Sequence, residues 1–344
     1  MSTANRLVVR VGRTGALGPA AVVALVASLA ACVVIGAGDV TYGHVATVLG
    51  TRLGLPVEPL PPLTDSLIWQ LRIPRVLLAA VVGAALAVCG AVLQALTRNA
   101  LADPYLLGVS SGASTGAVVV AVSGVGSTIG LTAGALAGAL TAFGLLLLLL
   151  RRSGLDSLRV VLTGVVVGQL FTALTSLVLM ASGDADTTRS VTYWLLGSLS
   201  SARWDGVVGC AVVTVLALVV CRYYAVSLDA LGFGADTAAS VGVDVRRTRL
   251  VLLVVTSLLT AVAVSAVGAI GFVGLIVPHG VRFLAGPLHR TLLPYSAVAG
   301  AVFLVWADAL ARVLLAPQEV PVGVFTALAG VPLFLLILKR RGEL

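Results

Sequence analysis

The sequence predicts an all-α, polytopic membrane protein with about ten transmembrane helices. The chain has 344 residues, of which 59% are hydrophobic and only 10% are charged, and its mean hydropathy is +1.11. Soluble domains carry about 25% charged residues, so a water-soluble class is excluded. Apolar runs repeatedly reach the roughly 20 residues needed to cross about 30 Å of hydrocarbon. We interpret residues 1–344 as a single transmembrane domain.

Each predicted span is an apolar run bounded by polar, basic or proline-rich residues. The first run follows Arg6, Arg10 and Arg13, and its length and the lack of a small-x-small cleavage site favour a retained span over a signal peptide. Prolines in the long segment 38–71 exclude a continuous helix there, and Pro104 ends a polar turn. The predicted spans are about 19–37, 76–97, 105–123, 129–150, 159–181, 205–221, 249–268, 271–285, 291–315 and 322–338.

Basic residues gather on one side of the membrane in this span count. Loops rich in Lys and Arg are cytoplasmic, so both termini and the loop 226–249 are predicted to be cytoplasmic. The net charge of +8 is explained by orientation and does not indicate a nucleic-acid partner. The residues on this side are Arg6, Arg10, Arg13, Arg151, Arg152, Arg222, Arg246, Arg247, Arg249, Arg290, Lys339, Arg340 and Arg341.

The patterns of an enzyme or metal site are missing. Cys32, Cys89, Cys210 and Cys221 lie in or beside apolar runs without CxxC spacing, and the three histidines show no ligand spacing. No GxxxxGK[ST] sequence is present, so the chain does not hydrolyse ATP in the P-loop manner by itself. We predict no catalytic residue, bound metal or cofactor.

The loop 226–249 is the longest polar interruption in the C-terminal two-thirds of the chain. Ser227 is a candidate N-cap for a short helix through Leu228–Leu231, and a second short helix is expected from about 235 to 241, ending at Gly242. Three arginines follow as a basic edge. Two short helices between membrane spans indicate a docking surface for a soluble partner, with a solvated connector as the alternative.

Three stretches are specific in combination. They are residues 72–114, which begin RIPRVLLAAVVGAAL, the loop ending LGFGADTAASVGVDV, and residues 268–312, which begin GAIGFVGLIVPHG and are followed by EVPVGVFTALAGVPLFLLILKR. Together they resemble the FecCD-type permeases, the membrane subunits of ABC importers for ferric siderophores, haem and cobalamin. The resemblance covers the chain from about residue 19 to its end. One departure is Asn99-Ala100, where the family commonly has asparagine-proline, and we expect it to loosen that turn slightly.

The resemblance implies a BtuC-like fold of about ten helices with an inverted repeat. Such a permease pairs with an identical or homologous copy, and the substrate pathway follows their interface. Two cytoplasmic ATPase subunits, which carry ATP and Mg²⁺, receive the loop between the sixth and seventh spans. A soluble binding protein delivers substrate to the outer face. The implied location is the bacterial cytoplasmic (inner) membrane.

Site residues follow from the same resemblance. Arg72 and Arg75, with guanidinium groups facing outward, and Arg312 would meet carboxylates of the binding protein; anchoring of the helix end by snorkelling is the alternative. Asp308 is expected to pair with Arg312 four residues on. The predicted ATPase contacts are Leu228, Asp229, Leu231, Gly232, Asp236, Ser240 and Gly242.

A wide pathway for a large cargo should be lined by small, weakly polar residues. The candidates are Ser110, Ser111, Ser114 and Gln169. Gln94, Asn99 and Gln169 are also candidates for hydrogen bonds between helices. His279, alone on a mostly apolar helix, is expected to be structural.

The predicted function is ATP-driven import of a ferric siderophore by alternating access. Import of cobalamin or haem is the alternative within the same class. An ion-coupled secondary transporter would need intramembrane carboxylates for its coupling ion, and only Asp308 qualifies, with an arginine as neighbour.

Overall fold

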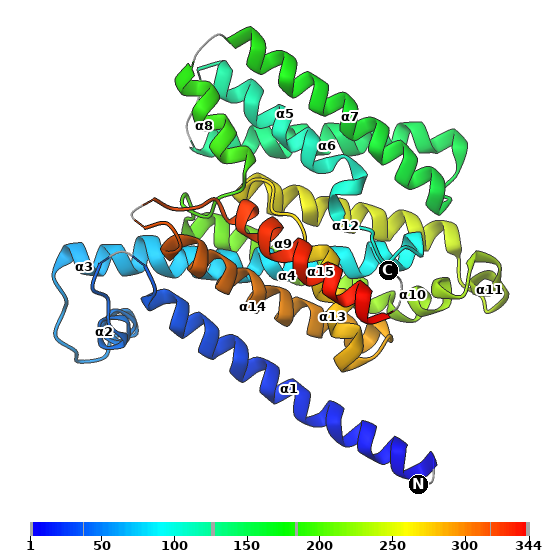
Figure 1. Ribbon diagram of the computed structural model, residues 1–344, viewed down its shortest axis with the longest axis horizontal. Coiled ribbons are helices and arrows are strands. Elements are labelled where there is room, and N and C mark those ends of the chain that lie inside the picture. The colour runs from blue at the N-terminus through cyan, green and yellow to red at the C-terminus, as the bar shows by residue number, and fades with distance from the viewer. Residues whose placement is uncertain (1–2, 37, 125–127, 183–184, 317, 342–344) are drawn as a thin grey trace.

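The computed structural model describes residues 3–36, 38–124, 128–182, 185–316 and 318–341, and these residues form helices joined by loops (Figure 1). The helices are α1 (Thr3–Val34), α2 (Tyr42–Arg52), α3 (Pro62–Ser66), α4 (Ile73–Thr97), α5 (Val109–Val122), α6 (Thr128–Ser153), α7 (Ser157–Ser182), α8 (Ala185–Leu195), α9 (Trp204–Tyr223), α10 (Ala225–Gly232), α11 (Ala235–Ser240), α12 (Val245–Val267), α13 (Val273–Ala285), α14 (His289–Val313) and α15 (Val322–Arg341). A π-helical segment, Leu67–Arg72, joins α3 to α4, and a short 3-10 turn, Pro104–Leu107, precedes α5.

The predicted membrane spans are confirmed as helices. Within the described ranges, six are long and apolar enough to cross a membrane: Pro62–Thr97, Gly130–Arg151, Ser157–Ser182, Trp204–Tyr223, Val245–Val267 and His289–Val313. Four shorter apolar helices complete the set: Gly18–Val34, Val109–Val122, Val273–Ala285 and Val322–Leu335. The chain is therefore a multi-pass, all-helical membrane protein.

Three predicted boundaries were wrong. The first helix begins at Thr3, well before residue 19. The second span belongs to one continuous helical stretch that begins at Pro62. Pro62 occupies a helix start, where its missing N–H donor is not needed. A π-helical turn precedes Pro74, so the helical stretch continues through this second proline. Ser227 does not cap α10, which begins two residues earlier at Ala225.

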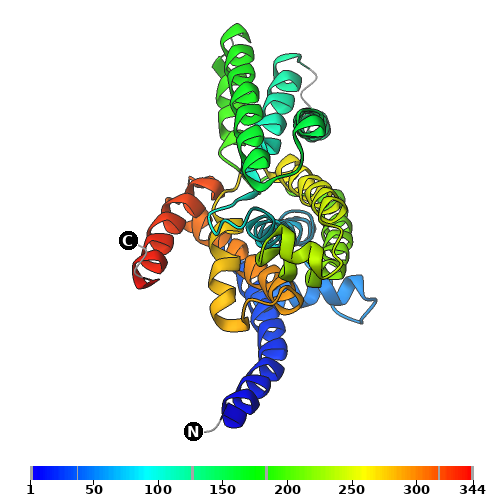
Figure 2. The same ribbon diagram turned by 90° about the vertical axis from the view of Figure 1, so that its right-hand side faces the viewer.

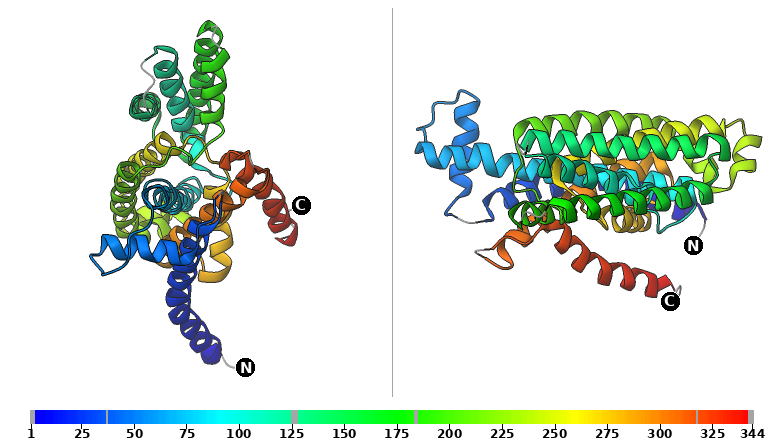
Figure 3. Two further views of the ribbon diagram at one scale, coloured as in Figure 1. Left: turned by 90° about the vertical axis from the view of Figure 1, so that its left-hand side faces the viewer. Right: turned by 90° about the horizontal axis from the view of Figure 1, so that it is seen from above.

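The α4 helix runs through the middle of the molecule and is buried along almost its whole length (Figure 2; Figure 3, left). Glycines let other helices approach it closely: a Cβ on Gly83 would overlap the carbonyl of Gly300 in α14, and a Cβ on Gly90 would overlap that of Gly274 in α13. Lipid does not drive helices together, so close backbone packing through small residues supplies the association.

The helices have two recognisable ends. Figure 1 shows α2 and α3 at one end, and α10, α11, the start of α1 and the end of α15 at the other. The start of α1, the end of α15 and the loop 226–249 share this end, as the span count requires (Figure 1). Their position on the cytoplasmic side stays a prediction. The helices α5 to α8 form a group beside the central bundle, and α15 lies on a different flank (Figure 2).

Candidate functional site

Two buried arginines close the C-terminal end of α1. The last carbonyls of a helix lack intrahelical donors and carry partial negative charge, and the two guanidinium groups satisfy them. The acceptors lie 2.7–3.2 Å from the guanidinium nitrogens and are the carbonyl oxygens of Val33, Val34 and Gly38 for Arg72, and of Cys32 and Ile35 for Arg312.

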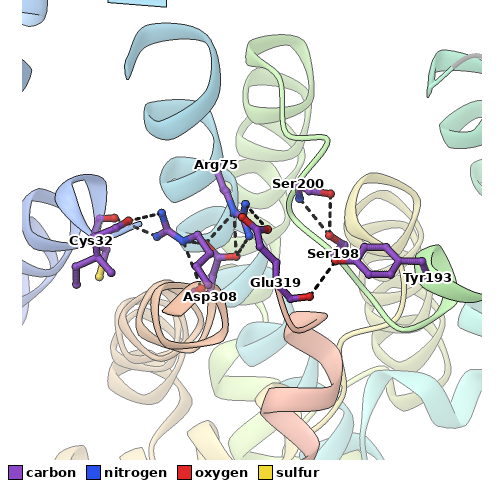
Figure 4. Close-up of polar contacts among 9 residues, drawn as sticks. Cys32, Arg75, Tyr193, Ser198, Ser200, Asp308 and Glu319 are labelled. Carbon is purple, nitrogen blue, oxygen red and sulfur yellow. Dashed lines mark hydrogen bonds and ion pairs between the residues drawn. The ribbon is translucent and has the colours of Figure 1, made fainter. Parts of the chain in front are cut away.

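A carboxylate joins this arrangement to the rest of the α2–α3 end (Figure 4). Asp308, 1% exposed, accepts from Arg75 at 3.0–3.1 Å and lies 3.2 Å from Nε of Arg312. Arg75 also pairs with Glu319, 40% exposed, at 2.9 Å. Tyr193 of α8 donates to the Glu319 carbonyl at 3.3 Å. The network therefore ties α1, α4, α14 and the loop before α15 together.

This geometry changes the interpretation of the three predicted docking arginines. The outward orientation expected for Arg72 and Arg75 is wrong: Arg72 is buried and Arg75 is mostly buried. Arg312 is buried as well, and carbonyls and carboxylates of the same chain surround all three. The predicted Asp308–Arg312 pair is confirmed. A role in meeting a binding protein stays a prediction.

The loop 226–249 forms two short helices, as predicted, but its residues divide into two groups. Leu228 and Leu231 are buried and anchor α10. Asp229 accepts from the His289 backbone N–H at 2.9 Å and lies 2.6 Å from His289 Nδ1, so it joins α10 to the start of α14. The exposed members of the predicted contact set are Gly232, Asp236, Ser240 and Gly242.

Two apolar side chains on this loop were not predicted as contacts. Phe233 is 80% exposed and Val241 is 67% exposed, at the ends of α10 and α11. Single exposed apolar side chains are normal on a protein surface, but these two lie among the exposed members of the predicted contact set, which makes them candidates for the same contact. The sequence did contain a signal for Phe233 as a contact residue: it is an aromatic residue between two helix-breaking glycines, Gly232 and Gly234.

A polar stripe runs along α7. Gln169, Thr172 and Ser176 are exposed and follow the i, i+3, i+7 spacing of one helix face. The Thr172 hydroxyl donates to the Ser111 hydroxyl of α5 at 3.3 Å. Polar groups at mid-membrane normally face protein or water and not lipid. Gln169 and Ser111 were predicted from the sequence, whereas Thr172 and Ser176, which make the stripe continuous, were not.

The other two predicted lining serines differ in position. Ser110 is buried inside the chain, whereas Ser114 is half-buried on α5. Behind them, Thr115 of α5 and Thr175 of α7 share a buried hydroxyl–hydroxyl contact of 2.8 Å. The pair fastens α5 to α7, so the hydroxyls of these helices serve packing as well as any pathway.

The polar residues near the α10–α11 end are structural in this chain. Gln94 bridges α4 to α13: it donates to the carbonyls of Gly274 and Leu275 at 3.2 Å and accepts from Arg282 at 2.6 Å, which confirms its predicted interhelical role. Asn99 was predicted wrongly, because its side chain accepts locally from the Leu101 N–H.

Asp103 holds the turn between α4 and α5. Its carboxylate accepts from the Tyr105 N–H at 3.0 Å, and burial raises the pKa of Asp103 to about 6. His279 packs edge-on against Phe283 and Phe334, as expected of a structural residue. Among the described residues, no group of three or more His, Cys, Asp or Glu side chains is placed to hold a metal ion.

The helix arrangement and the division into two polar ends define a membrane permease. The chain matches the FecCD transport family over residues 22–340. It is 40% identical over 330 residues to the cobalamin import system permease protein BtuC of Halobacterium salinarum, covering 93% of this chain and 88% of that one. It is 35% identical over 296 residues to the Fe(3+) dicitrate transport system permease protein FecC of Escherichia coli, covering 85% and 88%.

A solved structure, described as a metal-chelate type ABC transporter in an inward-facing conformation, has the same fold. It superimposes with a TM-score of 0.81 at 31% identity and covers 93% of this chain and 98% of the other. The chain belongs to the FecCD transport family. It is a permease subunit of an ABC importer whose cargo is an iron chelate, haem or cobalamin.

Proposed function

We propose that the chain moves a ferric siderophore into the cytoplasm by ATP-driven alternating access, as one of two identical or homologous permease copies in the bacterial cytoplasmic membrane. The observation that carries the proposal is the exposed stripe Gln169, Thr172 and Ser176 on α7. Lipid does not solvate such a stripe well, so it belongs to a pathway or to the second copy. Its side chains are neutral and weakly polar, which suits a large cargo that must be released.

The α10–α11 end is proposed to face the cytoplasm. It carries the basic loops, and loops rich in arginine stay on the cytoplasmic side. Phe233, Val241 and Asp236 would then contact an ATPase subunit that binds ATP and Mg²⁺. The partly buried contact of Asp229 with His289 would transmit motion from α10 to α14.

The α2–α3 end is proposed to receive the substrate-binding protein. Of the three arginines, Arg75 is nearest to the surface, where Glu319 neutralises one side of its guanidinium. Glu319→Gln should therefore strengthen docking to a carboxylate-bearing binding protein, whereas Arg75→Gln should weaken it. A titration of each full-length variant with the binding protein measures the affinity of docking. Equal affinity of the two variants would exclude Arg75 as a docking residue.

The ATPase contact is tested by Phe233→Glu combined with Val241→Glu. We expect loss of ATPase co-purification and of uptake, because two charges would enter an apolar contact. Leu53→Glu is the matched control: Leu53 is also well exposed, but it lies at the α2–α3 end. Equal co-purification in both variants would contradict this assignment.

The cargo is tested by uptake in cells that lack the chain, with labelled ferric siderophore, cobalamin and haem assayed side by side. Loss of siderophore uptake alone, restored by the wild-type chain, is the expected result. Cobalamin is the second candidate because of the 40% identical relative, and loss of cobalamin uptake alone would replace the first proposal. Uptake that stops when an ionophore collapses ion gradients, with ATP maintained, would instead indicate an ion-coupled transporter.

A further inference from the structure

A groove of about 790 Å³ opens between α6, the loop before α7, and the start of α12. It lies at the α10–α11 end and includes Arg246 and Arg249 of the loop 226–249, but it shares no residue with the proposed pathway or with the named ATPase contacts. Its apolar wall includes Leu147, Leu148 and Leu250, and four arginines, called the rim here, line it as well. Figure 2 shows α6 and α12 on the side of the molecule away from α15.

The rim concentrates positive charge. Arg151, Arg159, Arg246 and Arg249 line it, against one carboxylate, Asp156. Three of these arginines are exposed and come from three different segments: the end of α6, the start of α7 and the start of α12. Guanidinium groups that several segments supply to one groove suit a phosphate, which accepts several charge-assisted hydrogen bonds at once.

Arg249 is the fixed member of the rim. It is 9% exposed, and its Nη1 donates to the Leu155 carbonyl at 2.8 Å, which joins α12 to the loop after α6. Its Nε is buried and has no acceptor within the part of the chain that the structure describes. A buried donor without a partner is unfavourable, so a ligand oxygen in the groove would satisfy it.

The apolar wall specifies the rest of the ligand. Leu147 lies one helical turn before Arg151, about 6 Å deeper along α6, and the exposed Leu148 and Leu250 continue the wall. An acyl chain of the cytoplasmic leaflet reaches this depth, whereas a soluble protein does not. The headgroups of that leaflet include anionic lipids that attract arginine clusters.

We infer that this groove is a binding site for an anionic phospholipid, with the phosphate among the arginines and one acyl chain along the leucines. Bound there, the lipid would join α6 to α12 and support the position of the loop before α7. The site is separate from cargo binding and does not depend on which cargo is carried.

The test is lipid binding to the purified full-length chain in neutral detergent. Phosphatidylglycerol is titrated against phosphatidylcholine, and native mass spectrometry counts the bound lipid. In Arg151→Gln/Arg246→Gln, we expect roughly thirtyfold weaker phosphatidylglycerol binding, from about 1 kcal/mol per arginine near a membrane surface. Arg222→Gln/Lys339→Gln removes the same charge from exposed positions outside the groove and should bind as the wild type does.

A second variant tests the wall independently of charge. Leu148→Gln/Leu250→Gln should weaken phosphatidylglycerol binding while all four arginines remain, and glycerol phosphate, which has no acyl chain, should bind none of the proteins measurably. Equal binding of phosphatidylcholine, equal loss in the control pair, or binding of glycerol phosphate as tight as that of the lipid would each overturn the inference. The inference would also be overturned if the arginine variant lost its association with the ATPase but still bound phosphatidylglycerol as the wild type does.

Discussion

Asp308 is the single carboxylate that two largely buried arginines share, and replacing it with asparagine tests whether this network stabilises the α2–α3 end. The substitution keeps the shape of the side chain and removes its charge. Arg75 and Arg312 then lose the counter-charge at 3.0 and 3.2 Å. We expect the variant to fold with a clearly lower free energy of unfolding.

The magnitude follows from burial. Removing one partner of a buried ion pair costs about 3–5 kcal/mol because a charge is left uncompensated. The lower value, about 3 kcal/mol, applies here because both arginines keep other acceptors. Arg75 retains Glu319, and Arg312 retains the carbonyls of Cys32 in α1 and of Ile35 just after it. Glu319→Gln is the matched control, since a pair with an exposed partner contributes about 0–1 kcal/mol.

The assay is reversible unfolding of the full-length chain in mixed micelles, with helix content followed as the fraction of denaturing detergent rises. Arg75→Gln and the double variant with Asp308→Asn complete a double-mutant cycle, and groups in contact typically show a coupling of 0.5–3 kcal/mol. If Asp308→Asn destabilises the protein no more than Glu319→Gln does, the charge network does not carry the stability assigned to it.

Two further predictions concern packing and pH. Gly90→Ala should destabilise the protein by about 1–3 kcal/mol, because the added Cβ overlaps the Gly274 carbonyl. Gly209→Ala is the control and should not destabilise the protein, because the space around Gly209 is open. Equal stability of the two variants in the same assay would contradict the packing argument. Asp103→Asn should raise the midpoint of thermal unfolding at pH 7 and leave it unchanged below about pH 4. The raised pKa of Asp103, about 6, means that the unfolded state ionises first, so this carboxyl lowers stability as pH rises from about 4 to 6. A difference between the proteins that grows as pH falls would show that the sign is wrong.

Length and composition were sufficient to predict the membrane fold. Each span is a long, mostly apolar run, and a chain in lipid must satisfy its backbone groups internally, which leaves the helix as the solution. The same local reasoning located the end of α10 and the whole of α11 from their glycines, and the basic loops predict that both termini share a side. It failed at the start of α4, where Pro62 and Pro74 occupy positions that a helix tolerates.

The tertiary structure decided which polar groups face each other. Arg72 and Arg75 stand three apart in LRIPR, and no local rule shows that one closes the end of α1 while the other meets Asp308, 233 residues away. The four arginines of the groove likewise come from segments nearly a hundred residues apart. Hydrophobic length is a property of one segment and can be predicted from it, whereas the partner of a charge depends on how separate helices pack. Apolar length in the sequence therefore predicts about ten membrane crossings, whereas the partners of the arginines follow from the packing of separate helices.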